Sequence, residues 1–368
     1  MVSCNNMQEY NIKKYYVSGF TLVELMISLA LGLIITAAAA LLFLTGQKNI
    51  AMQKGAAELQ DNANFGLNYI TKDLRLTNLN TRNATINDAS LYGGIVLTSA
   101  ASDFVQTQTD TSVTPNVVTK YSNLPVSITT VGNTLLTQNN GITTVGSQNV
   151  WTGASNVSNT TGTALLSDQL VIQYLPQYTL NNNGTPSDTS DDKYQGGYDC
   201  EGNKLEFSEL RYVIQRYFLR TDNNKSSSDA SALSLACDAG SYPVTNPTAI
   251  TGFGGAGEII MKRVDYFHIL LGVQTGTDTA STRYQYLSIA DYMAKAAPRP
   301  RIISIQVGAL VRSLQSVGAD SAIKADQQFT VLDKVVKTKA AVNTSQSKYI
   351  RQVVSQTVAL RNALGERE

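Results

Sequence analysis

Residues 19–44 read GFTLVELMISLALGLIITAAAALLFL, and this stretch decides the fold of the 368-residue chain. From residue 25 to residue 44 it contains no charged side chain. At about 1.5 Å per residue, a helix of this length spans roughly 30 Å, which is the thickness of a bilayer's hydrocarbon core. A buried core helix is the alternative, but such helices are seldom apolar on every face over this length. The stretch therefore predicts a transmembrane helix.

The helix is expected to continue well beyond the apolar stretch. Apolar residues recur at the spacing of one helical face at Leu59, Ala63, Leu67, Ile70 and Leu74. The first proline is Pro115, so one helix is predicted from about residue 20 to about residue 78. A secretory signal peptide is the nearest rival, but its apolar region is only about 7–15 residues long and ends at a cleavage site.

Two charged features set this stretch apart from an ordinary anchor. Glu24 lies at the start of the apolar run. A carboxylate inside a bilayer costs about 2.5–3.5 kcal/mol on insertion scales, so a functional role is expected, with a snorkelling residue at the membrane edge as the alternative. Lys13 and Lys14 precede the run, and they predict a cytoplasmic amino terminus with a translocated carboxy-terminal part.

The segment Gly19-Phe20-Thr21-Leu22-Val23-Glu24 follows a short basic leader and opens the apolar helix. It resembles the class III signal of type IV pilins and type II secretion pseudopilins. The resemblance implies that prepilin peptidase cuts between Gly19 and Phe20, and that Phe20 becomes an N-methylated amino terminus. Glu24 would then lie one helical turn from the new amine. In a filament it could pair with the amine of a neighbouring subunit and fix the axial register.

Beyond about residue 90 the pattern changes to short β-prone runs between Asn-, Thr-, Ser- and Gly-rich turns. Strands are predicted at 91–97, 116–121, 125–131, 141–145, 168–175, 209–220, 258–273, 301–313, 328–332 and 351–362. A short helix is predicted within 283–297, and segments 99–165 and 220–257 are predicted to be loops or insertions. The expected fold class is α+β: a pilin fold, with a long amino-terminal helix packed on an antiparallel β-sheet that carries loop-rich insertions.

The same pattern divides the chain into four expected parts. Residues 1–19 form a prepilin leader peptide, and residues 20–44 the transmembrane half of the helix. Residues 45–80 form its periplasmic half, and residues 81–368 a periplasmic β-rich globular domain. The leader contains Lys13, Lys14 and Glu9, so the remaining chain carries equal numbers of acidic and basic residues.

Further segments resemble one branch of this family, the PilW-type minor pilins. They are residues 55–76, 198–203 with the later Cys237, 258–293 with 310–313, and the closing 355–364. Residues 85–190 resemble nothing known, and the Gly-Cys element that this branch often carries before its first strand is absent. The resemblance implies a structural subunit, not an enzyme, that primes type IV pilus assembly at or near the tip. Surface adhesion, twitching motility or DNA uptake would follow.

The implied partners are other minor pilins, the major pilin, prepilin peptidase, the inner-membrane assembly platform and a large tip adhesin. The implied location is the inner membrane, crossed once, and then the pilus at the cell surface. Two alternatives remain open. A J-type minor pseudopilin of a type II secretion system shares every amino-terminal feature, and a membrane-anchored periplasmic enzyme or binding protein would retain residues 1–19.

The cysteines are consistent with export. Cys4 lies in the leader, which leaves Cys200 and Cys237 as an even pair in an oxidising periplasm. A disulfide between them would close a loop of about 36 intervening residues and stabilise the fold by roughly 3–4 kcal/mol. Two free, buried thiols are the alternative.

Other candidate sites are weak. The single histidine, His268, excludes a multi-His metal site, and 29 basic against 28 acidic residues argues against a nucleic-acid-binding face. An acidic loop with Asp188, Asp191, Asp192 and Asp199 could hold Ca²⁺, but it lacks EF-hand spacing, so a solvated loop is preferred. The Gly-rich segment 252–257 lacks the lysine of a P-loop and is expected to be a turn before a strand. His268 is expected to be a packed or surface strand residue. No cofactor or metal is predicted.

Overall fold

The computed structural model describes residues 19–364 apart from 102–105, 111, 113–116, 140–151, 186, 226–228, 230, 277–280, 298, 318–322, 325–326 and 340–347. The chain forms two compact units, residues 1–51 and residues 52–368, each described here by itself. Helix α1 (Leu22–Leu74) contributes to both units. We call residues 52–368 the second unit.

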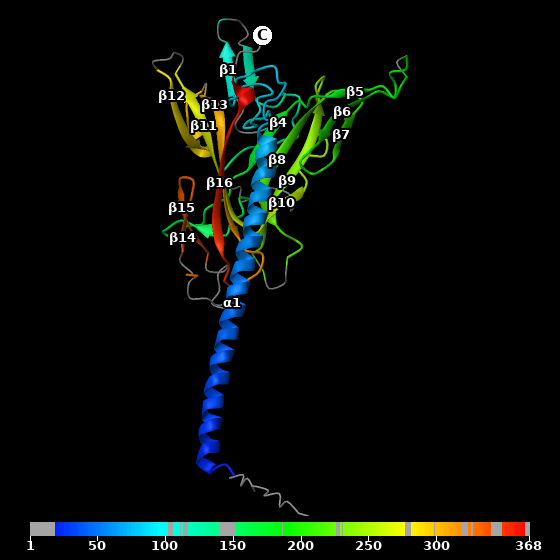
Figure 1. Ribbon diagram of the computed structural model, residues 1–368. Helices are drawn as coiled ribbons and strands as arrows, with labels where there is room; N and C mark the ends of the chain where they lie inside the picture. Colours follow the sequence, from blue (N-terminus) through cyan, green and yellow to red (C-terminus); the bar gives the residue numbers. More distant parts are fainter. Residues whose placement is uncertain are drawn as a thin grey trace, which may run out of the picture. The chain divides into compact units, whose positions relative to one another are not determined.

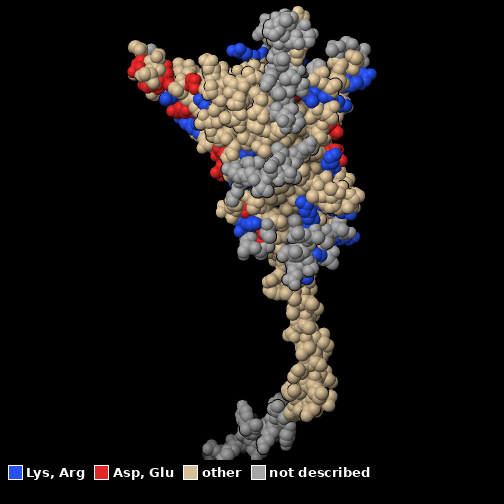
Figure 2. Space-filling view, turned by 180° about the vertical axis from the view of Figure 1, so that it is seen from behind, with Lys and Arg blue, Asp and Glu red and all other residues tan. Residues whose placement is uncertain are grey.

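The first unit contains the apolar half of α1. Among the described residues, α1 is the one helix long and apolar enough to cross a membrane, and none of its most apolar window is buried. Figure 2 shows this lower helix as tan, with few charged side chains on that face. The prediction of a long amino-terminal helix is confirmed. It begins at Leu22, behind Thr21, and ends at Leu74, before Asn78 adopts a positive φ of 63°.

The second unit packs the remaining part of α1 against its core. Leu59, Ala63, Ile70 and Leu74 are buried, as the predicted face requires, and Leu67 is half-buried against the same core. In Figure 1 this part of α1 runs between β16 on one side and β8 to β10 on the other. The amphipathic stripe therefore identified the packing face of the helix.

The helix approaches strand β10 (Glu258–Lys262) very closely at Gly66. A Cβ at Gly66 would come within 2.5 Å of Met261 Cε and 2.7 Å of Met261 Cβ, so only glycine leaves room. One turn earlier, Asn62 Nδ2 donates to Lys262 O at 2.7 Å, and Lys262 N donates to Asn62 Oδ1 at 3.0 Å. The helix is thus both packed on and hydrogen-bonded to an edge strand.

Two four-stranded sheets build the second unit, and every strand pair in them is antiparallel. The first has the order β10-β9-β8-β4, and the second β12-β11-β13-β16. Their remaining bounds are β4 (Leu170–Tyr174), β8 (Arg211–Thr221), β9 (Leu233–Pro243), β11 (Val264–Thr275), β12 (Arg283–Ser288), β13 (Arg301–Arg312) and β16 (Arg351–Ala359). Side chains from α1 and both sheets meet in one large core. The predicted α+β class, a long helix on antiparallel sheet, is confirmed.

Smaller elements surround these sheets. They are β1 (Gln106–Asp110) with β2 (Val117–Tyr121), β5 (Thr179–Asn181) with β6 (Lys193–Tyr198) and β7 (Lys204–Phe207), and β14 (Gln328–Val331) with β15 (Lys334–Thr338) and β3 (Val157–Ser158). Short helices are η1 (Asn133–Leu135), α2 (Ile289–Met293) and η3 (Arg361–Ala363). The strand β12 occupies the first part of the segment predicted to be helical at 283–297.

Several local predictions were wrong. Segment 220–257 was expected to be loop, but the eleven-residue strand β9 lies within it. It is buried along nearly its whole length, and its small residues fit that close packing although they resemble a loop in composition. Residues 91–97 form only an isolated bridge at Ile95, and residues 125–131 form no strand. The expected strand at 141–145 lies outside the described residues.

The run 258–273 was predicted as one strand, and it is two. Arg263 separates β10 from β11 with a φ of 57°, which is uncommon for a residue with a side chain. β10 pairs with β9 in the first sheet, and β11 pairs with β12 and β13 in the second. Arg263 is therefore the point at which the chain passes from one sheet to the other.

Candidate functional site

The predicted processing motif lies at the start of α1. Gly19 and Phe20 are exposed, non-helical residues in front of the helix, and a Cβ at Gly19 would meet no atom within 4 Å. Thr21 is placed as the helix N-cap: Glu24 N donates to Thr21 Oγ1 at 3.2 Å, and Thr21 N donates to Glu24 Oε2 at 3.2 Å. This reciprocal pair is a capping box. Glu24 therefore completes the hydrogen bonding of the helix start.

The capping role of Glu24 was readable from the sequence but was missed. A Thr followed three residues later by Glu, before an apolar run, is the signature of a capping box. The sequence argument considered Glu24 only as a carboxylate in a membrane. The structure adds that its oxygen also lies 3.3 Å from Thr21 Oγ1, so the carboxylate is aimed back toward the amino-terminal end.

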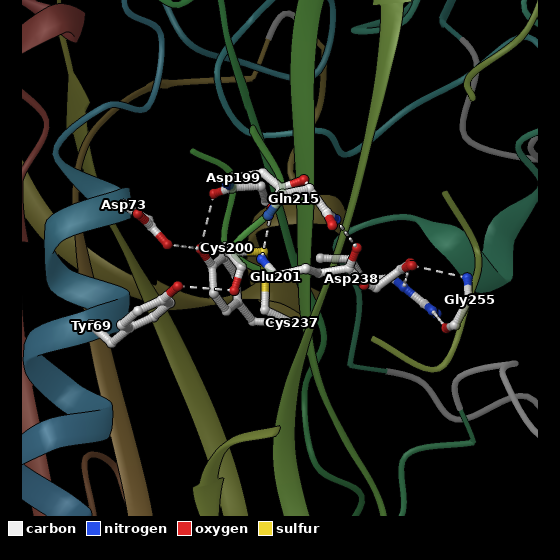
Figure 3. Close-up of a disulfide and its surroundings, with 12 residues drawn as sticks. Tyr69, Asp73, Asp199, Cys200, Glu201, Gln215, Cys237, Asp238 and Gly255 are labelled. Atoms are coloured by element: carbon white, nitrogen blue, oxygen red, sulfur yellow. Dashed lines mark hydrogen bonds and ion pairs between the residues drawn. A yellow bond between two sulfur atoms is a disulfide. The ribbon is translucent and has the colours of Figure 1, made fainter. Parts of the chain in front are cut away.

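The second predicted feature, the disulfide, is present between Cys200 and Cys237 (Figure 3). The two Cα atoms are 6.1 Å apart, and both residues are buried. Cys200 lies in the turn between β6 and β7, and Cys237 lies within β9. The bond thus attaches the small β5-β6-β7 sheet to the first large sheet, and the alternative of two free thiols is excluded.

The carboxy-terminal end of α1 lies beside this disulfide (Figure 3). The Tyr69 hydroxyl donates to Cys200 O at 3.0 Å. Nearby, Tyr217 Oη lies 2.8 Å from Asp73 Oδ2 and 3.0 Å from Gln215 Oε1. Helix, disulfide and strand β8 are thus connected through side chains that the sequence analysis did not single out.

Asp73 is a buried carboxyl group near the end of α1. A phenol has one hydrogen to donate, yet Tyr217 has two oxygen neighbours at hydrogen-bond distance. The Tyr217 hydroxyl therefore shares its hydrogen between the buried Asp73 carboxyl and Gln215. Burial raises the pKa of Asp73, and the negative charge of Asp199 adds to the shift. The position near the helix carboxy terminus also disfavours a negative charge.

Acidic residues near the disulfide do not form a metal site. Burial, and then the negative charges of Asp238, Asp199 and Glu258, raises the pKa of Glu201 to about 7. Within the described part of the chain, no three His, Cys, Asp or Glu side chains are arranged to hold a metal ion.

Two carboxylates of the predicted acidic loop accept hydrogen bonds from backbone groups within its own turns. Asp188 Oδ1 accepts from Ser190 N at 2.9 Å, and Asp199 Oδ1 accepts from Glu201 N at 2.9 Å and from Asn203 N at 2.8 Å. Local turn hydrogen bonds therefore account for these two side chains.

The Gly-rich segment 252–257 is a turn held by a buried ion pair rather than a phosphate cradle. Arg216 Nε lies 3.0 Å from Asp238 Oδ2, and both side chains are buried. The Asp238 carboxylate also accepts from Gly254 N and Gly255 N, each at 2.9 Å. At Gly257, with a φ of 65°, a Cβ would lie 2.2 Å from Cys237 O. Close packing against the disulfide strand therefore requires glycine at position 257.

His268 is buried between two carboxylates. Its Nδ1 lies 2.8 Å from Asp168 Oδ2, and its Nε2 lies 2.7 Å from Asp333 Oδ1 in the turn between β14 and β15. Burial disfavours the charged imidazolium and by itself would lower the pKa of His268. The hydrogen bonds and negative charges of Asp168, and then of Asp333, outweigh this effect, so the pKa is raised. The prediction of a packed strand residue is confirmed, but its two partners, 65 and 100 residues away, were not foreseen.

This geometry predicts a pH dependence. Because the folded state raises the pKa of His268, the stability it provides is fully present below about pH 6.5 and is lost as the pH rises through the folded-state value. The free energy of unfolding of the full chain should therefore fall as the pH rises above about 6.5, and it should fall less in His268→Gln. Urea titrations at several pH values measure this. Equal slopes for the two proteins would contradict it.

Two family models match the chain. The prokaryotic N-terminal methylation motif matches residues 15–40, and the type IV pilus-assembly protein W model matches residues 216–362. Over residues 216–362 the chain is thus similar to the PilW family of type IV pilus-assembly proteins. A type IV-like pilin from Thermus thermophilus is a similar solved structure, with 9% identity, a TM-score of 0.30, and coverage of 83% of this chain and 98% of that chain. No curated protein sequence matches the chain significantly.

The two matches cover different parts of the chain. The methylation motif contains Gly19, Phe20 and Glu24, and therefore the capping box at the start of α1. The pilus-assembly match runs from β8 to η3 and includes Cys237 but not Cys200. Residues 85–190, for which the sequence showed no resemblance, lie outside both matches. The similarity to known pilus proteins therefore lies in the amino-terminal motif and in most strands of the two large sheets.

Proposed function

We propose that this protein is a PilW-type minor pilin that helps prime type IV pilus assembly and sits at or near the pilus tip. One observation carries the proposal: a processing motif opens an exposed apolar helix that continues into a folded, β-rich body. Such a subunit would support adhesion, twitching motility or DNA uptake. PilW-family proteins are structural components, and an enzymatic role is not part of the proposal.

Processing by prepilin peptidase is proposed at the bond between Gly19 and Phe20. Gly19 is exposed and makes no close packing contact, so the fold itself does not require glycine there. The requirement is assigned to the peptidase, which must bind an extended backbone with little side-chain bulk at this position. Phe20, 86% exposed, then becomes the methylated amino terminus.

Assembly is proposed to depend on Glu24. In the described chain its carboxylate is held at the helix start by Thr21. Cleavage creates a cationic amine at Phe20, one turn away. In an apolar environment the carboxylate and an amine attract strongly, and each offsets the desolvation cost of the other. Pairing with the amine of a neighbouring subunit would set the axial register of the filament.

The proposed location follows from the same helix. Before assembly the protein is anchored in the inner membrane by residues 20–44, with the leader 1–19 in the cytoplasm and residues 45–80 and 81–368 in the periplasm. Its proposed partners are prepilin peptidase, the assembly platform, other minor pilins, the major pilin and a tip adhesin. No direct binding of nucleic acid is proposed.

Two variants test processing and assembly separately. Gly19→Arg should leave a full-length membrane precursor on immunoblots, whereas Glu24→Ala should be cleaved normally but incorporated into sheared pili poorly. Glu58→Ala is the matched control, since Glu58 lies on the same helix and makes an exposed pair with Lys54. Mass spectrometry of the wild-type protein should find N-methyl-Phe20. Normal cleavage of Gly19→Arg, or wild-type pili with Glu24→Ala, would contradict the respective role.

A J-type minor pseudopilin of a type II secretion system is the second candidate. The methylation motif at residues 15–40 fits both assemblies, whereas the pilus-assembly match over 216–362 favours the pilus. Deletion of the gene separates them. Loss of surface pili with intact secretion supports the pilus assignment, and retained pili with a type II secretion defect supports the pseudopilin.

A further inference from the structure

The second unit contains a pocket of about 840 Å³ whose wall includes none of the residues proposed for processing or assembly. Its wall comes from three separate segments, within 82–92, 121–127 and 244–248. Pockets of this size accommodate small organic ligands. Two residues of the wall, Tyr92 and Asn246, have a positive φ, which is uncommon for residues with a side chain.

Tyr92 occupies a conformation that its side chain disfavours. Gly93 N donates to Ser90 O at 2.8 Å, which closes a tight turn, and Tyr92 has a φ of 62° within it. Glycine or asparagine suits such a position, and a bulky residue there costs roughly 1–3 kcal/mol. The protein thus keeps an aromatic ring at a position whose backbone favours a small residue.

The Tyr92 ring is held in a fixed orientation. It stacks on Tyr212 at a centroid distance of 4.6 Å and an interplanar angle of 6°, and Tyr212 stacks in turn on the buried Tyr242 at 5.3 Å. Tyr92 lines the pocket, and Tyr212 does not. Tyr212 therefore covers one face of the Tyr92 ring, and the ring forms a rigid aromatic part of the pocket wall.

Several hydrogen bonds to Asn123 hold the turn that contains Tyr92. Asn123 O accepts from Tyr92 N at 2.9 Å, and Asn123 Nδ2 donates to Ser90 O at 3.0 Å and to Asn87 O at 2.6 Å. Asn123 is fully buried. This support keeps the strained turn in place before any ligand arrives, which reduces the entropy cost of binding.

Another segment of the wall, within 244–248, supplies polar side chains. The side chains of Thr245, Asn246 and Thr248 are exposed to the pocket, and none has a hydrogen-bond partner among the described residues. The only charged residue in the wall is Arg82. A ligand for this pocket is therefore rich in hydroxyl or amide groups, has one apolar face, and is neutral or negatively charged.

We propose that this pocket binds a pyranose unit of a neutral or acidic oligosaccharide. The C–H face of the sugar ring stacks on Tyr92, and its hydroxyls exchange hydrogen bonds with Thr245, Asn246 and Thr248. Arg82 accommodates a carboxylate where the sugar is a uronic or sialic acid. A proline-rich peptide also stacks on tyrosine, but its backbone offers carbonyl acceptors and few donors. Threonine hydroxyls and an asparagine amide, which donate and accept, match a sugar better.

The test uses the full chain in a detergent without a sugar headgroup. The protein is applied to an array of immobilised neutral, uronic-acid and sialylated oligosaccharides, and the strongest binder is titrated free in solution by calorimetry. Saturable binding in both formats is expected for a site that recognises the sugar itself. A polyproline peptide is titrated in parallel.

Three variants assign binding to the pocket. Tyr92→Asn should weaken binding at least tenfold, because it removes the ring while suiting the left-handed backbone. Asn246→Gly should weaken binding severalfold, since glycine also accepts its φ of 50°. Tyr284→Asn, which alters an exposed tyrosine on β12, should bind as the wild type does. The proposal is overturned if no arrayed sugar binds, if Tyr92→Asn binds normally while folded, or if only polyproline binds.

Discussion

Replacing Cys237 by Ser is expected to lower the free energy of unfolding of the second unit by about 4 kcal/mol. The disulfide closes a loop across a sequence separation of 37, and the chain-entropy relation gives this magnitude for a loop of that length. The loss is not offset locally, because Cys237 is fully buried in β9 and a serine hydroxyl there would add an unpaired polar group. The β5-β6-β7 sheet would also lose its covalent attachment.

The measurement is urea unfolding of the full chain in detergent, followed by near-ultraviolet circular dichroism. Cys4→Ser is the matched control, since Cys4 lies in the proposed leader and outside the disulfide. It should leave the midpoint unchanged, while dithiothreitol added to the wild type should reproduce the Cys237→Ser value. A drop below about 1 kcal/mol for both the variant and the reduced protein would show that the bond contributes little to stability.

Arg312→Ala is expected to cost about 3–5 kcal/mol of unfolding free energy, because it removes one partner from a buried ion network. Arg312 is fully buried, and its Nη2 lies 2.7 Å and 2.9 Å from the two oxygens of Asp229. Its Nε lies 3.2 Å from Asp265, which also pairs with Arg351 at 2.8 Å. Without Arg312, Asp229 and Asp265 would be buried with less compensating charge.

The ion network also includes Arg263, so its loss should destabilise more than one strand. Arg263, at the crossing between the two sheets, pairs with Asp222 at 2.7 Å and approaches Asp229 at 3.1 Å. Arg361→Ala is the control, since Arg361 is exposed and should change stability by less than about 0.5 kcal/mol. Thermal unfolding of both variants provides the comparison, and an Arg312→Ala protein as stable as the control would contradict the electrostatic argument.

Local sequence signals identified the helix and much of the sheet. The uncharged run 25–44 and the stripe from Leu59 to Leu74 defined α1 and its buried face because helical periodicity is a short-range property. The strand pattern around Ile305 and Val307 placed β13 correctly for the same reason. The pairing of Cys200 with Cys237 followed from their number and compartment, since Cys4 lies in the leader.

Long-range partners were not predictable. Asp168 and Asp333 reach His268 only after three different elements fold together, and no spacing in the sequence marks them. Strand β9 was read as loop because burial on both faces selects small residues there. The ring of Tyr92 stacks on Tyr212 from a segment more than a hundred residues earlier in the chain, so this alignment depends on the completed fold.

The paired hydrogen bonds between Asn62 and Lys262 have a consequence for solubility. An asparagine amide offers one donor and one acceptor side by side, as a residue of a neighbouring strand would, so the helix substitutes locally for a missing fifth strand. The irregular register between Ile259 and Met261 further disrupts this border of the sheet. An unpaired border is a template on which other chains add and form aggregates. In the proposed role as a pilus subunit the protein would meet many similar subunits, and blocking that border would remove one route to incorrect association.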